Sequence, residues 1–253
     1  MAIRNGEYDL AVESEGVEIA KFHWFIQENR STDRRQDITL IWRSSPSGQG
    51  VPGGTEVPAA DLYKRNSQSQ PGYEQALQAA ARKEYDKAIE LMKKILAEDP
   101  KDFEAWSKLG LMQFLKGDAA ESEKSYMHSL EAKPDYVAAL VNLGNLRITT
   151  KNFDGAIESL SKAVELQPVS ADANYLLGEA YLQVKKGSKA VGYLTEAIRL
   201  DPTGKADAHL RLAALYNAAK LKDKAAAEYE QFLAKRPDYP DRKKLEEYIR
   251  QNK

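Results

Sequence analysis

The sequence contains no cysteine, so the chain cannot form disulfides, bind zinc through thiolates or use a cysteine nucleophile. It also has no excess of charge of either sign, with 37 basic against 38 acidic residues. It therefore lacks the positive charge that attracts nucleic acids and anionic membranes. No stretch approaches the ~18 apolar residues that a membrane-spanning helix needs. We expect a soluble chain with no nucleic-acid partner and no direct membrane insertion.

The beginning of the chain shows no export signal. Residues Met1–Leu10 lack the basic region and the apolar run of a signal peptide. The absence of cysteine does not fix a compartment, because proteins without disulfides occur in all of them. Two settings stay open: a cytoplasmic chain or, if the chain is truncated before Met1, an exported or periplasmic one.

Residue patterns that carry enzyme chemistry are also missing. His23, His128 and His209 lie in separate segments without the spacing of metal ligands, so we expect no metal site. The glycine-rich stretch 50–54 is not followed by the Lys-Ser or Lys-Thr of a phosphate-binding loop. Asp172 and Glu179 share one helical face, but the sequence indicates no apolar pocket around them. The sequence predicts no catalytic residues, no cofactor and no enzyme activity.

A repeat of about 34 residues is the strongest signal that is present. Pro100, Pro134, Pro168 and Pro202 are each 34 residues apart, and Pro237 follows after 35. Periods of this length are typical of stacked helical hairpins. A proline just past a helix cannot continue it, so each proline marks the end of one hairpin.

Small and large residues recur in phase with the prolines, when each repeat is counted so that its proline is position 32. Position 8 is small in every repeat: Ala76, Gly110, Gly144, Gly178 and Ala213. Position 20 is also small: Ala88, Ser122, Ala156, Ala190 and Ala225. Position 24 is large: Met92, Tyr126, Leu160, Leu194 and Tyr229. Small residues let two antiparallel helices approach closely, large residues fill the space beside them, and stacking buries a continuous core.

These motifs resemble the tetratricopeptide repeat family, and the resemblance covers residues 70–238. The family pattern is matched in the second repeat by Trp106, Leu109, Gly110, Tyr126 and Pro134. The resemblance implies a mainly α fold, namely a right-handed α-solenoid of five helix pairs in a domain at 71–253. The expected repeats are 71–102, 103–136, 137–170, 171–204 and 206–239, with a capping helix at 240–251.

The first seventy residues differ. Alternating apolar and polar residues predict a small three-stranded antiparallel β segment in 1–43, with a bulge near Ala20, followed by a linker at 44–70. The stretch 6–12 resembles the end of a carboxypeptidase-regulatory-like β-sandwich domain, which implies a cell-envelope setting. Such a sandwich needs about seven strands. The segment is therefore either a truncated sandwich or a small hairpin.

The resemblance also implies a binding groove along the first helix of each pair. The predicted peptide-binding residues occupy groove positions: Leu111, Val141, Asn145, Ile148, Tyr175, Glu179, Leu182 and Leu210. Apolar side chains at positions that face water indicate a contact surface. The alternative is that they only pack between repeats. Four acids stand at groove positions 2 or 9, and they favour a partner segment with apolar and basic residues: Glu104, Asp172, Glu179 and Asp207. Asn145 is the best candidate for hydrogen-bonding the backbone of that segment.

The sequence therefore predicts a non-catalytic scaffold for protein–protein interaction. Two alternatives stay open: a self-assembling homo-oligomer and the regulatory part of a larger protein. Capture of an acidic C-terminal tail is disfavoured, because Asp207 stands where the two-carboxylate clamp of chaperone-binding repeats has a lysine.

Overall fold

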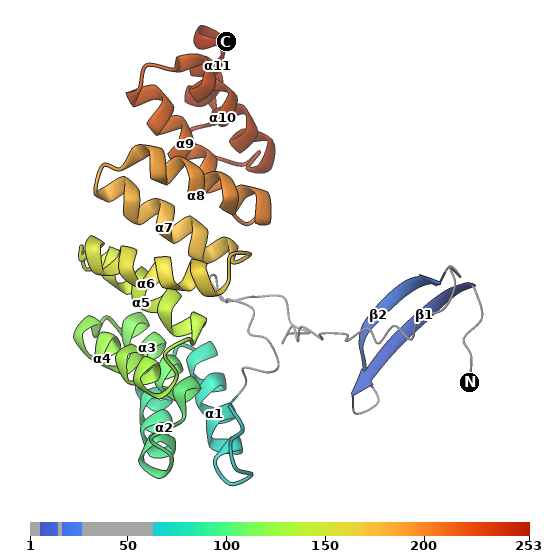
Figure 1. Ribbon diagram of the computed structural model, residues 1–253, viewed down its shortest axis with the longest axis vertical. Helices are drawn as coiled ribbons and strands as arrows, with labels where there is room; N and C mark the ends of the chain where they lie inside the picture. Colours follow the sequence, from blue (N-terminus) through green and yellow to red (C-terminus); the bar gives the residue numbers. More distant parts are fainter. Residues whose placement is uncertain (1–5, 15–16, 27–62) are drawn as a thin grey trace. The chain divides into compact units, whose positions relative to one another are not determined.

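The computed structural model describes residues 6–14, 17–26 and 63–253 (Figure 1). The chain divides into two units, one with the strands and one with the helices. No helix within the described ranges is long and apolar enough to cross a membrane.

The strand unit contains a β-hairpin. Strand β1 (Gly6–Ser14) pairs antiparallel with strand β2 (Val17–Ile26). The register shifts between Val12 and Glu13, which leaves Ile19 of β2 as an extra residue. This irregularity lies one residue before the position predicted for a bulge. The predicted third strand lies outside the described residues, so the three-stranded segment stays a prediction.

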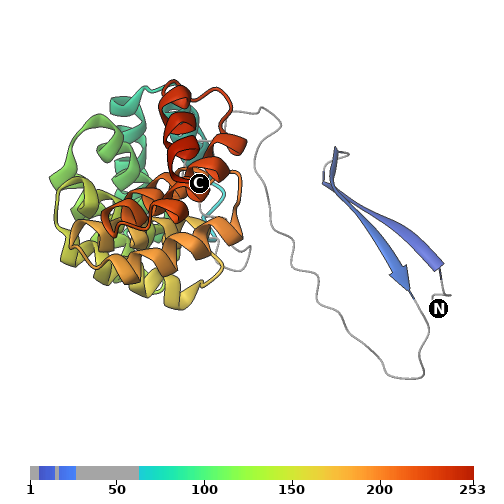
Figure 2. The same cartoon turned by 90° about the horizontal axis from the view of Figure 1, so that it is seen from above.

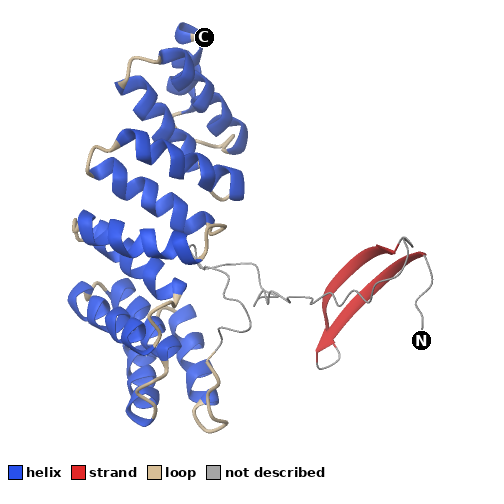
Figure 3. Ribbon diagram, in the orientation of Figure 1, coloured by secondary structure: helices blue, strands red, loops and turns tan. Residues whose placement is uncertain are grey.

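Eleven α-helices fill residues 70–252 of the described part (Figures 1 and 3). They are α1 (Gln70–Ala81), α2 (Tyr85–Glu98), α3 (Phe103–Lys116), α4 (Ala119–Ala132), α5 (Val137–Thr149), α6 (Phe153–Leu166), α7 (Ala171–Gln183), α8 (Gly187–Leu200), α9 (Asp207–Ala218), α10 (Lys222–Lys235) and α11 (Arg242–Asn252). The first ten form five antiparallel hairpins that stack in chain order, and Figure 2 looks along this stack. The predicted set of five helix pairs and a final helix is confirmed.

Each hairpin turns through one residue at position 15 with a positive φ angle. These residues are Lys83 (63°), Gly117 (101°), Lys151 (63°), Lys185 (59°) and Lys220 (61°). The next N–H then bonds to a carbonyl five residues back, as from Asn152 to Arg147 at 2.8 Å. This arrangement satisfies carbonyl groups that the end of the first helix would leave without partners. A lysine there also places positive charge near those carbonyls.

Close contact between the two helices of a hairpin depends on the small residue at position 8. A Cβ atom added to Gly144 would lie 2.4 Å from Cγ of Leu160, and one added to Gly178 would lie 2.7 Å from Cγ of Leu194. Both leucines are fully buried. The predicted role of position 8 is confirmed, and the structure adds that the large side chain at position 24 lies directly on it.

The first helices of the hairpins form one layer. Helix α3 contacts α5, and α5 contacts α7. Arg211 of α9 reaches Glu179 of α7, with 2.7 Å between its Nε and a carboxylate oxygen. We call the side of the stack formed by α1, α3, α5, α7 and α9 the first-helix face.

Helix α11 covers the last hairpin. Leu245 and Ile249 pack against the buried cluster that includes Phe232. Tyr248 meets the ring of Tyr229 edge to face, with 5.2 Å between centroids. The apolar stripe predicted for this helix therefore packs against α10, while its charged residues face solvent.

Candidate protein-binding face

One of the eight predicted groove residues is buried in the core. Val141 is only 2% exposed and belongs to a buried cluster with Leu140 and Ala173. Leu210 of α9 is partly buried and packs against the cluster that includes Phe232 and Leu233, while it keeps exposed area. For Val141 the structure therefore favours the alternative interpretation, in which the side chain fills space between elements of the stack.

Five other predicted residues lie partly exposed on the first-helix face. They come from three neighbouring helices: Leu111 from α3, Asn145 and Ile148 from α5, and Tyr175 and Leu182 from α7. Ile148, Tyr175 and Leu182 rest against the core while keeping exposed area. The side-chain amide of Asn145 makes no hydrogen bond to any described residue, so it is available to a ligand.

Glu179, the eighth residue, has a basic partner on the next first helix. Its carboxylate accepts the 2.7 Å hydrogen bond from Arg211, and its side chain is 14% exposed. Burial raises the pKa of Glu179 above its usual value, although the nearby Arg211 opposes the rise. Burial also raises the pKa of the Tyr175 hydroxyl, and the negative charge of Glu179 adds to this.

The acidic character predicted for this face is largely neutralised by the chain itself. Of the four acids at position 2 or 9 that suggested it, Glu104 pairs with Arg65, Asp172 with Lys205 and Glu179 with Arg211. The fourth, Asp207, is exposed. These internal pairs weaken the argument from net charge for a basic partner.

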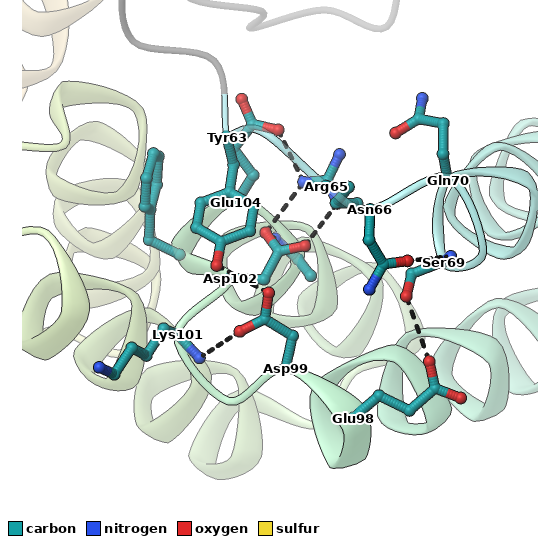
Figure 4. Close-up of polar contacts among 12 residues, drawn as sticks. Tyr63, Arg65, Asn66, Ser69, Gln70, Glu98, Asp99, Lys101, Asp102 and Glu104 are labelled. Atoms are coloured by element: carbon teal, nitrogen blue, oxygen red, sulfur yellow. Dashed lines mark hydrogen bonds and ion pairs between the residues drawn. The ribbon is translucent and has the colours of Figure 1, made fainter.

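The end of the predicted linker contacts the first two hairpins (Figure 4). We call residues 63–69 the strap. The Tyr63 hydroxyl donates to Asp99 at 2.7 Å, and its ring meets Phe103 edge to face. The Ser69 hydroxyl donates to Glu98 at 3.1 Å.

Arg65 makes the densest contacts of the strap. Its Nη2 donates to a carboxylate oxygen of Asp102 at 2.9 Å and of Glu104 at 2.7 Å, and its Nε also donates to Asp102. Its guanidinium carbon lies 3.4 Å from the ring centroid of Tyr73. We call Tyr73, Asp102 and Glu104 the arginine site.

The arginine site is buried. The Arg65 side chain is 4% exposed and that of Asp102 is 0% exposed. Asp102 also caps α3, because it accepts a 2.8 Å bond from the N–H of Ala105. Burial lowers the pKa of the neighbouring Lys108, partly opposed by Glu104. In the sequence, the only sign of this site is an aromatic residue and two basic residues at 63–65, and nothing in the sequence identifies their partners.

The fold and this face define a scaffold of repeated helical hairpins, a class that is typically non-enzymatic. Family models of the tetratricopeptide repeat match residues 79–143, 141–205 and 207–239. The chain therefore belongs to the tetratricopeptide repeat family through residues 79–239. Proteins of this family bind proteins or peptides.

Individual relatives are distant. Tetratricopeptide repeat protein 5 of Bos taurus is 25% identical over an alignment of 174 residues that covers 61% of this chain and 39% of that protein. The chain spans 16% to 39% of the lengths of three such curated relatives.

Solved structures show the same fold. A crystal structure of MamA superposes with a TM-score of 0.60 at 25% identity, covering 64% of this chain and 94% of that one. YrrB, described as a repeat protein with an unusual peptide-binding site, superposes with a TM-score of 0.60 at 19% identity, covering 71% of this chain and 92% of its own.

Proposed function

We propose that this chain is a non-catalytic scaffold that holds a segment of another protein along the first-helix face. One observation carries the proposal: the amide of Asn145, which has no hydrogen bond to the described residues, lies among partly exposed apolar residues of three neighbouring first helices. An extended segment has backbone groups that an amide can bond and side chains that apolar neighbours can bury. The peptide-binding site ascribed to YrrB supports the same use of the fold.

The proposed surface is central in the stack. Leu111, Asn145 and Leu182 come from the second, third and fourth hairpins. Val141 is buried and is not part of this surface. Leu210 lies on α9 and is not included in it. We expect a partner segment to contribute mainly apolar anchors, with backbone bonds to Asn145.

Selection from a displayed library of random peptides tests the proposal without knowledge of the natural partner. Peptides that bind the wild-type chain are tested against Asn145→Ala and Ile148→Ala. Each substitution should weaken binding by roughly fivefold or more, since removal of a central contact residue costs over 1 kcal/mol.

Leu166→Ala is the matched control. Leu166 ends α6, a second helix, and is 45% exposed. This variant should bind the selected peptides as tightly as wild type does. Equal affinity of all three variants, or a loss confined to Leu166→Ala, would place the binding surface elsewhere.

A further inference from the structure

The strap is held in the manner of a bound peptide. Its backbone hydrogen bonds within the described residues are local: the Arg65 N–H donates to the Tyr63 carbonyl, and the N–H groups of Gln70 and Tyr73 donate to the carbonyls of Asn66 and Ser69, where α1 begins. Apart from this junction with α1, the contacts of the strap to the helices come from side chains, above all from Arg65. A short segment held mainly by one buried side chain is what a groove ligand with an anchor residue looks like.

The arginine site matches a guanidinium group in chemistry as well as in shape. Two carboxylates receive three N–H groups, and the Tyr73 ring covers the guanidinium. Arginine presents a planar group of donors that suits both kinds of contact, whereas lysine presents a point charge. The geometry of the site therefore suits the guanidinium of Arg65 better than it would suit an ammonium group.

A second basic residue contacts a carboxylate and lies near a tyrosine ring elsewhere on the first-helix face. Lys205 pairs with Asp172, and its ammonium nitrogen lies 5.8 Å from the ring centroid of Tyr175. Asp172 occupies position 2 of its repeat, as Glu104 does, and Tyr175 occupies position 5, as Tyr73 does. Acids near the start of first helices, together with tyrosine, thus hold basic side chains at both ends of the face.

We propose that the arginine site is a ligand-binding subsite that Arg65 fills in cis, and that an arginine of a bound protein segment replaces Arg65 there. The claim that a partner segment supplies this arginine rests on the proposed function, whereas binding of arginine at the subsite can be tested alone. The incoming arginine makes the same hydrogen bonds, so the exchange sacrifices only the remaining strap contacts. The strap is tethered next to its site, at an effective concentration on the order of millimolar, so it excludes weak competitors.

The test uses the strap itself as the probe. A fluorescent synthetic peptide with the sequence of residues 63–69 is titrated into the full wild-type chain and into Tyr63→Ala/Arg65→Ala, and binding is followed by anisotropy. The double variant should bind the peptide at least about tenfold more tightly than wild type, because its tethered competitor is removed.

Removing the charge at the arginine position of the peptide shows whether the arginine site is what binds it. The same peptide with citrulline in place of arginine keeps the shape but loses the charge, and it should bind about tenfold more weakly or worse. Adding Glu104→Gln to the double variant should also weaken binding of the arginine peptide. Adding Glu158→Gln, an exposed site on α6, should leave binding unchanged.

Circular dichroism confirms that each variant is helical, and Arg65→Met with Tyr63 intact replaces the double variant if that one unfolds. Equal binding of the citrulline and arginine peptides, or no binding to a folded variant, overturns the proposal. Neither result affects the proposed function, which rests on residues of α3, α5 and α7.

Discussion

Substitution of Gly144 by alanine tests whether close helix approach determines hairpin stability. The added Cβ would lie 2.4 Å from Cγ of Leu160 and under 3.0 Å from both of its Cδ atoms. The side chain cannot escape by moving only its tip, because Cγ itself is in the way. Overpacking of this kind costs about 1–3 kcal/mol.

Helix propensity opposes the steric cost. Alanine is more favourable than glycine within a helix by about 0.5–1 kcal/mol. The steric effect is larger, so we expect Gly144→Ala to destabilise the chain by about 1–2 kcal/mol in urea denaturation followed by circular dichroism. Gly192→Ala is the control, because a Cβ at Gly192 of α8 meets nothing within 4 Å. It should be stabilising by about 0.5–1 kcal/mol.

A second substitution identifies the clashing partner. Leu160→Ala alone should cost about 2–5 kcal/mol, as expected for a fully buried leucine. In that background Gly144→Ala should no longer destabilise, because the obstructing atoms are gone. If Gly144→Ala proves as stabilising as Gly192→Ala, the argument from close approach is refuted.

Two further predictions concern ionisable groups. Burial raises the pKa of Glu179 above its usual 4.5, so its stabilising contribution is complete below that value and is lost as pH rises through the folded-state pKa. Denaturation at pH 4 and pH 7 should show that the free energy of unfolding of Glu179→Gln rises relative to that of wild type at the higher pH. A fall relative to wild type would mean that the ion pair with Arg211 outweighs the cost of burying the charge. Burial and the bond to Asp99 raise the pKa of Tyr63 from 10.0 to about 12, so its contribution persists below 10 and disappears as pH passes 12. The difference in ultraviolet absorbance between wild type and Tyr63→Phe should titrate near pH 12, and titration near 10 would show that the strap contact is absent in solution.

The repeat architecture could be predicted because each of its determinants is local and recurs. Prolines mark hairpin ends, and the pairing of Gly144 with Leu160 follows from fixed positions within one repeat. Burial depth could not be predicted in the same way. Val141 and Tyr175 share position 5, yet Val141 is buried while Tyr175 keeps exposed area, so the position in the repeat does not determine burial.

The arginine site could not be predicted because it joins distant parts of the chain. Arg65 precedes Asp102 and Glu104 by 37 and 39 residues. Periodicity describes the repeats, but it says nothing about where a non-repeating segment crosses them. A polar composition suggested a linker, although the same residues supply the buried ion pairs of the strap.

The left-handed backbone conformation of the residue at position 15 has a consequence for how the stack assembles. Every pair of helices carries its own reversal within about fifteen residues of its start, so any of the five can close before its neighbours have formed. The order of folding is then decided by which pair is most stable, and the chain needs no single starting point.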